Sequence, residues 1–209
     1  MSTLQDAGVD ATHSLLTRRA VLLGLAALPL SDLAAAPAAR SAKALIAAAR
    51  RQVGVTLSYD PAYTRLPFPG GDVSRAKGVC TDVLIRAYRD ALALDLQPLV
   101  NADMRANFAA YPRRWALKTT DRSIDHRRVP NLATFFARQH AKLPIPRDAD
   151  GWQPGDIFTS LIDGRLPHIG IVSNRGRGVV IHNIGGGARE EPALFNHTLT
   201  GRYRWALSG

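Results

Sequence analysis

The sequence predicts a domain of the α+β class, with helices packed on an antiparallel sheet that follows them in the chain. Two observations carry this prediction. Up to about residue 140, apolar residues recur three and four positions apart, which is typical of amphipathic helices. From Trp152 onward, short apolar runs are separated by glycine-containing turns, which is typical of strands. The chain of 209 residues is long enough for one such domain with its own core.

Each expected helix has a start or a stop signal. Ser41 is a suitable N-cap for the first helix, and Gly54 follows its end. The second helix begins at Cys80, and Pro112 ends the third. Asn131 is expected to cap the fourth, whose two phenylalanines we place in the core. The expected helices cover residues 42–53, 80–93, 101–110 and 132–139.

The expected strands are bounded by turn residues. Asp163-Gly164 separates the first two strands of the sheet, and Gly185-Gly186-Gly187 ends the third. Earlier in the chain, a short strand over 55–59 precedes a loop over 60–77. A loop of that length in a compact domain commonly serves a site, and this one leads directly to the second helix. The sheet strands are expected over residues 156–162, 169–173, 179–184 and 202–206.

The first 39 residues are typical of an export signal, which leaves a single domain over 40–209. Arg18-Arg19 precedes a mildly apolar stretch that is too short to span a bilayer. Small residues over 34–39 suit cleavage by signal peptidase. The arginine pair resembles a twin-arginine signal, so we expect a periplasmic or secreted protein without stable membrane insertion after cleavage. The alternative is a buried N-terminal helix.

The composition restricts the classes of partner. The formal net charge is +10, which favours attraction to an anionic polymer such as the cell wall, although a GC-rich genome would also enrich arginine. Because no helix-turn-helix, zinc finger or aromatic-basic pattern occurs, we expect no nucleic-acid partner. One cysteine cannot form an internal disulfide. No cofactor and no metal are expected.

Three residues form a candidate catalytic set. Cys80 stands at a helix start, where partial positive charge and free N–H groups stabilise a thiolate. His168 and His182 each adjoin an apolar strand and suit a general base and its orienting residue. If they act together, the pKa of the thiol should fall below its usual value of about 8.5. Two alternatives are a structural cysteine with two hydrogen-bonded histidines, and a metal site with these three ligands.

Four pieces of sequence in order resemble the papain-like fold of NlpC-type cell-wall peptidases. They are the Cys80 helix, Pro154-Gly155-Asp156, His168-Ile169-Gly170-Ile171-Val172 and Ile181-His182. The resemblance implies a Cys80 nucleophile, a His168 base and a His182 third member. It also implies a supporting role for Tyr59 toward the oxyanion, while Asn183 could orient the base in place of His182.

A wider resemblance covers nearly all of the chain after the signal. Cys80-Thr81-Asp82-Val83, residues 124–131, Trp152-Gln153-Pro154-Gly155-Asp156 and residues 181–187 resemble an exported bacterial family, domain of unknown function 1287, generally placed near the NlpC-type peptidases. Two features depart from the NlpC pattern. The usual Asp-Cys-Ser-Gly is replaced around Cys80, where Asp82 would oppose thiolate formation, and a helical insert occupies about 94–144.

The insert contains Asp125, His126, Arg127 and Arg128, which are either a structural salt-bridge cluster or a clamp for a substrate carboxylate. Our leading hypothesis is an exported cysteine hydrolase that cleaves an amide bond, with peptidoglycan stem peptides as the favoured substrate. The expected partner is therefore a cell-wall peptide or another anionic amide. The alternative is a non-catalytic cell-wall-binding module on the same fold.

Overall fold

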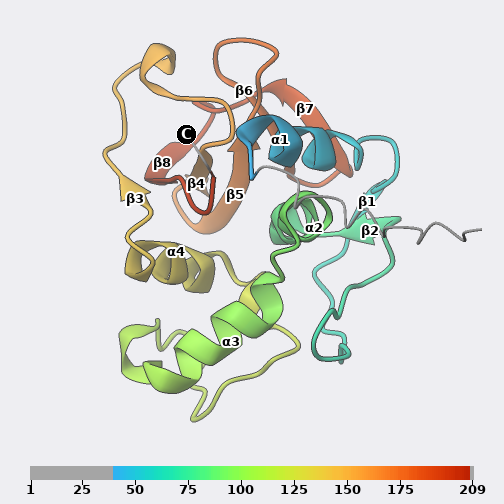
Figure 1. The fold of residues 1–209 in the computed structure, drawn as a ribbon, viewed down its shortest axis with the longest axis vertical. Coiled ribbons are helices and arrows are strands. Elements are labelled where there is room, and N and C mark those ends of the chain that lie inside the picture. The colour runs from blue at the N-terminus through green and yellow to red at the C-terminus, as the bar shows by residue number, and fades with distance from the viewer. Residues whose placement is uncertain (1–39, 208–209) are drawn as a thin grey trace, which may run out of the picture. The chain divides into compact units, whose positions relative to one another are not determined.

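Helices precede the sheet along the chain, so the α+β prediction is confirmed (Figure 1). The computed structural model describes residues 40–207, and the predicted export signal over 1–39 lies outside them. Within that described part, no helix is both long enough and apolar enough to cross a bilayer. The helices are α1 (Ala42–Arg50), α2 (Cys80–Leu92), α3 (Leu96–Ala106) and α4 (Val129–Arg138), with 3-10 turns η1 (Phe108–Ala110), η2 (Asp125–Arg127) and η3 (Ala149–Gly151).

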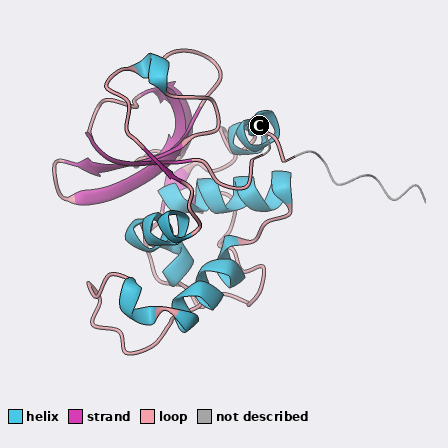
Figure 2. Cartoon of the chain, turned by 60° about the vertical axis from the view of Figure 1, so that its left-hand side comes forward, coloured by secondary structure: helices cyan, strands magenta, loops and turns pink. Residues whose placement is uncertain are grey.

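Six strands form an antiparallel sheet in the order β3-β8-β4-β5-β6-β7, with the four α-helices gathered on one side of it (Figure 2). A separate parallel pair, β1 and β2, aligns Tyr59 with Gly78 and so brings the loop start beside the residues that precede α2. The strands are β1 (Ser58–Tyr59), β2 (Lys77–Gly78), β3 (Lys142–Leu143), β4 (Ile157–Ile162), β5 (Leu166–Val172), β6 (Val179–Asn183), β7 (Ala188–Pro192) and β8 (Thr198–Tyr203).

The main core lies between the helices and one face of the sheet. Val83 and Leu84 of α2 pack in one cluster with Ile169 and Ile171 of β5 and Ile181 of the neighbouring strand β6. Burying each such side chain contributes roughly 1.5–3 kcal/mol. Both phenylalanines of α4 lie in the same core, as expected.

The other face of the sheet carries a smaller cluster. Phe158, Val172 and Val180 belong to it, and strand alternation assigns His168 to this face because Ser160 and Phe158 oppose His168 and Gly170 in the ladder. His168 and its neighbour Ile169 therefore face opposite sides of the sheet.

Four helix boundaries differ from the prediction by three or more residues. α1 ends at Arg50 rather than 53, where a turn follows, and α3 ends at Ala106 rather than 110, where the separate 3-10 turn η1 follows; the other two are helix starts. α3 begins at Leu96 rather than 101, because the Asp95 side chain accepts a hydrogen bond from Gln97 N–H at 3.1 Å and Pro98 is tolerated in a first turn. α4 begins at Val129, so Asn131 is inside the helix and caps nothing. The Asn131 amide instead donates to the Asp125 carbonyl at 3.1 Å.

The strand predictions were wrong in three places. β5 begins at Leu166 rather than 169, and the last strand is Thr198–Tyr203 rather than 202–206. The strand expected over 55–59 is only two residues long in the structure, where it is β1. β2, β3 and β7 were not predicted, and Lys77 of β2 lies within the expected loop over 60–77 but pairs with Ser58 of β1. β7 reads Ala-Arg-Glu-Glu-Pro, and a polar edge strand of this kind has no apolar alternation to reveal it.

Candidate active site

Cys80 is the first residue of α2 and its side chain is buried. The helix start is closed by Asp82, whose Oδ2 accepts a hydrogen bond from the Val79 N–H at 2.7 Å. Around the sulfur, the Ile169 backbone N–H and the Tyr59 hydroxyl are close enough to interact with it. The predicted nucleophile is thus held between the start of a helix, strand β5 and strand β1.

Asp82 is turned toward an arginine of the insert. Its two carboxylate oxygens accept hydrogen bonds from Arg127 Nε and Nη2, both at 2.8 Å. Both side chains are almost fully buried. The two residues lie on α2 and η2, so this ion pair fastens the insert to the helix that carries Cys80.

The charge state of the thiol differs from the expectation. Burial raises the pKa of Cys80 to about 11, although the Ile169 N–H favours the thiolate and partly opposes the rise. Asp82 adds a smaller repulsion in the same direction as burial. The expected fall below the usual value was therefore wrong, and the resting site holds a neutral thiol. Burial also raises the pKa of Tyr59, so its hydroxyl stays protonated and can donate.

The two predicted histidines form a chain with a third residue that sequence reasoning missed. His168 Nε2 lies 2.9 Å from His182 Nδ1, and His182 Nε2 lies 3.0 Å from Glu191 Oε1. A carboxylate only accepts, so His182 carries its proton on Nε2 and accepts on Nδ1. His168 must then donate from Nε2, which leaves its Nδ1 as a free acceptor. Glu191 lies on β7, whose existence the sequence pattern did not indicate.

Both imidazoles are neutral in this arrangement. Burial lowers the pKa of His168 to about 3 and also lowers the pKa of His182, where Glu191 partly opposes it. The His168 ring packs 5.9 Å from the Phe158 ring, on the sheet face opposite to Ile169. Among residues 40–207, no hydrogen bond joins the Cys80 thiol to either imidazole. The structure therefore brings the backbone next to His168, and not its ring, into hydrogen-bonding contact with the sulfur.

Asn183 has a supporting position of its own. Its Nδ2 donates to the Gly78 carbonyl at 2.9 Å and to the Ser58 carbonyl at 3.3 Å. It therefore ties β6 to the segments that carry Tyr59 and Cys80. The alternative in which Asn183 orients His168 was wrong, because the contact to His168 Nε2 comes from His182.

A groove with a volume of about 320 Å³ opens beside Cys80. Four of the predicted site residues line it, and Pro167, which precedes His168, forms part of its wall. Neither His168 nor His182 is among its lining residues. The predicted residues in the groove are Tyr59, Cys80, Arg127 and Arg128.

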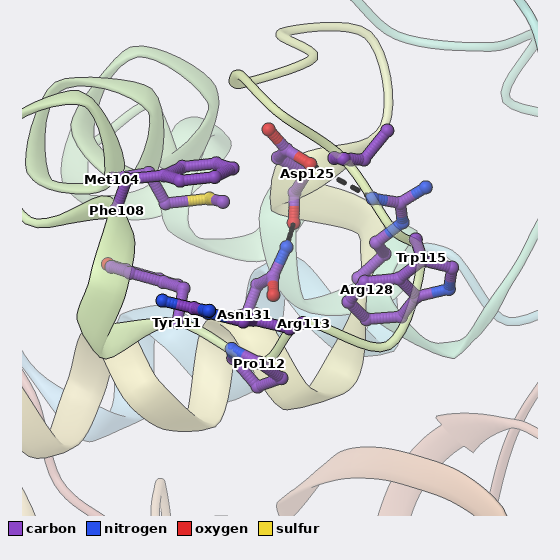
Figure 3. Close-up of a pocket in the computed structure, with 10 residues that line it drawn as sticks. Met104, Phe108, Tyr111, Pro112, Arg113, Trp115, Asp125, Arg128 and Asn131 are labelled. Atoms are coloured by element: carbon purple, nitrogen blue, oxygen red, sulfur yellow. Dashed lines mark hydrogen bonds and ion pairs between the residues drawn. The ribbon is translucent and has the colours of Figure 1, made fainter.

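The insert cluster divides into a buried half and a groove-facing half. Asp125 is buried and accepts from Arg128 Nη1 at 3.1 Å and from the Asp121 N–H at 2.6 Å, so its role is structural. His126 is also buried, and burial lowers its pKa to about 4. Arg128 stacks over Trp115, with 4.1 Å between the guanidinium carbon and the ring centroid (Figure 3).

Replacement of Asp82 by alanine should destabilise the fold strongly. The change removes a helix cap and leaves the Arg127 guanidinium buried without its partner, which costs on the order of 3–5 kcal/mol. Urea unfolding followed by circular dichroism measures the free energy of unfolding. As a control, Asp90→Ala removes the exposed pair with Arg75 and should cost at most about 1 kcal/mol. Equal losses for the two variants would contradict the assignment.

The positions of the side chains that could coordinate a metal ion bear on the alternative of a metal site. In the part of the chain that the structure describes, no three histidine, cysteine, aspartate or glutamate side chains come together as ligands for one ion. Cys80, His168 and His182 therefore do not form a ready ligand set.

Comparison of the sequence with known proteins shows the family to which this chain belongs. A family profile described as "Domain of unknown function (DUF1287)" matches residues 46–205, which include Cys80, both histidines and Glu191. The chain is also 52% identical over 161 residues to the "Uncharacterized protein YijF" of Escherichia coli (strain K12), and the alignment covers 75% of this chain and 78% of that relative. The protein therefore belongs to the DUF1287 family.

Proposed function

We propose that this protein is a cysteine hydrolase with a papain-like fold of the NlpC type, which cleaves an amide bond. The observation that carries the proposal is the placement of Cys80. Cys80 is the first residue of α2 and lines the wall of a groove, and its sulfur contacts the backbone N–H of Ile169. Ile169 directly follows His168, which begins the hydrogen-bonded chain His168–His182–Glu191. A nucleophile, a base and an orienting chain are the parts that acyl transfer requires.

The tautomers assigned to His168 and His182 determine which nitrogen can accept the thiol proton. His168 Nδ1 accepts the thiol proton as Cys80 Sγ bonds to the amide carbon, and His182 with Glu191 stabilises the imidazolium. The C–N bond then breaks, the imidazolium proton passes to the departing amine, and a thioester remains. Water attacks the thioester, gives one proton to His168, and releases the acid while the thiol is restored. The His168 ring packs against Phe158 on the sheet face opposite Ile169, so this proton transfer requires the imidazole to turn toward Cys80 when substrate binds.

Two donors can stabilise the oxyanion. The Cys80 backbone N–H has no intrahelical acceptor because it is at the start of α2. The Tyr59 hydroxyl lies at the same sulfur and stays protonated. Donors aimed at a developing oxyanion are commonly worth about 3–4 kcal/mol each in the transition state.

The setting proposed for this activity is the periplasm, reached through the twin-arginine signal in residues 1–39. The favoured substrate is the stem peptide of peptidoglycan, whose negative charge suits the net charge of +10. The test is to incubate purified peptidoglycan with the wild type and with Cys80→Ser, and to compare the released fragments by mass spectrometry. Fragments with a new amine and a new carboxyl end, absent with the variant, support the proposal. Identical fragment sets would overturn it for this substrate.

A second candidate function is a binding module without catalysis. It is favoured by the raised pKa of the Cys80 thiol, which leaves little thiolate near neutral pH, together with the arginines in the groove. This alternative requires that wild type and Cys80→Ser bind cell-wall fragments equally and release none.

The alkylation of Cys80 should depend on pH as a buried, neutral thiol does. With a pKa of about 11, the thiolate fraction, and with it the rate of reaction with iodoacetamide, rises about tenfold per pH unit from pH 7 to pH 10. In urea the rise should level off near pH 8.5. The measurement is the second-order rate against pH, with circular dichroism to verify folding. A plateau between pH 6 and pH 8 in the native protein would show a stable thiolate–imidazolium pair instead.

A further inference from the structure

One buried nitrogen of Arg127 has no partner. Two atoms of its guanidinium, Nε and Nη2, are used by Asp82, whereas Nη1 has no hydrogen-bond acceptor within residues 40–207. The residue is 6% exposed and lines the groove beside Cys80. A guanidinium stays charged at any physiological pH, and an unsatisfied buried donor of a charged group is costly. The wall of the groove therefore contains a solvent-shielded donor that lacks its acceptor.

The surroundings of this nitrogen favour an anion. Three arginines line the groove, and no aspartate or glutamate occurs among its described lining residues. Arg114 is exposed and forms no ion pair within the described part of the chain, whereas Arg127 and Arg128 are balanced by Asp82 and Asp125. Most other lining residues are apolar or aromatic. The groove thus combines one uncompensated positive charge with apolar walls.

We propose that this groove is a carboxylate-binding subsite, in which Arg127 Nη1 and Arg114 hold a free carboxylate of the substrate beside Cys80. A carboxylate accepts without donating, and it already satisfies the other two nitrogens of the same guanidinium through Asp82. The inference rests on the proposed function, because it names the substrate class. That class is an amide or peptide with a free carboxylate close to the scissile bond. A volume of about 320 Å³ accommodates a group of amino-acid size.

Because Cys80 is the only cysteine of the chain, two alkylating agents of similar size can probe the subsite. Iodoacetate carries a carboxylate and iodoacetamide does not, and each forms an S–C bond with loss of iodide. The ratio of their rates cancels the thiolate fraction and reports charge recognition alone. We expect the ratio at Cys80 to exceed the ratio for glutathione at least about fivefold, since a nearby cation raises the local concentration of an anion.

Variants then test the two arginines. Arg114→Gln should lower the ratio toward that of glutathione, and Arg127→Lys, which keeps the charge but loses the fork, should lower it in part. Arg105→Gln is the matched control, because Arg105 is exposed, lies outside the groove and carries the same charge. The control should leave the ratio unchanged. A ratio equal to that of glutathione, or equal effects of Arg114→Gln and Arg105→Gln, would overturn the proposal.

A binding measurement tests the carboxylate subsite without alkylation of the thiol. In Cys80→Ser labelled at the arginine side chains, N-acetylglutamate should shift the Arg127 Nε–H resonance in a saturable way, and uncharged N-acetylglutaminamide should not. Equal responses to the two compounds would overturn the subsite. These results distinguish failure of the subsite from failure of the proposed hydrolase activity. Carboxylate preference without any hydrolysis leaves the subsite and removes the enzyme, whereas hydrolysis of amides that lack a carboxylate, at the same rate, removes the subsite and leaves the enzyme.

Discussion

Replacement of Cys80 by alanine is expected to lower amide hydrolysis by at least about 10³-fold, because the attacking sulfur is removed while the groove and the donors remain. The fold should persist. The side chain is small and the loss of its sulfur from the core costs roughly 1–2 kcal/mol, less than the stability of an ordinary domain. Turnover of a peptidoglycan fragment measures the first effect, and thermal unfolding measures the second.

The control is a variant of the same helix that is at least as destabilising. Val83→Ala removes two methyl groups from the fully buried face of α2 and leaves the thiol in place. It should unfold at a lower temperature and still hydrolyse the substrate. If Cys80→Ala hydrolyses normally, the nucleophile is elsewhere. If it fails to fold while Val83→Ala folds, Cys80 is structural.

Replacement of His168 by alanine should reduce turnover as severely as loss of the thiol, because it removes the base. A graded loss is expected along the chain of hydrogen bonds. Glu191→Gln keeps an acceptor for His182 Nε2 but removes the negative charge, so we expect a loss of about 10-fold to 10²-fold, as for other residues that orient a catalytic ligand or base. His182→Ala should lie between the two.

If Glu191 positions the base through His182, its removal should change the pH dependence of kcat/KM. A negative charge near His182 stabilises the imidazolium form of the pair, so its removal should lower the pKa of the base. The acid limb of kcat/KM should then shift to lower pH in Glu191→Gln. Glu190→Gln is the matched control, because Glu190 is the neighbouring acid on the opposite face of β7 and bonds Arg50 at 2.6 Å. An unshifted acid limb in Glu191→Gln, or the same shift in both variants, would show that Glu191 does not position the base.

Local pattern was enough to find the elements that carry the candidate site. The helix at Cys80 was predicted to within one residue at its end, because its apolar stripe and its start are properties of neighbouring residues. The class, helices followed by an antiparallel sheet, followed from the change of period near residue 150. The pairing of His168 with His182 was also expected, since each histidine stands at a fixed place on an apolar strand.

Contacts between distant residues were decided only by the tertiary structure. Arg127 meets Asp82 across 45 positions, and His182 meets Glu191 through the register of β6 with β7. No local period encodes either contact, because a register depends on how whole strands and helices pack. The thiol pKa was predicted in the wrong direction for the same reason. A helix start favours a thiolate, but the depth at which packing buries Cys80 determines the cost of its charge, and that depth is a property of the folded chain.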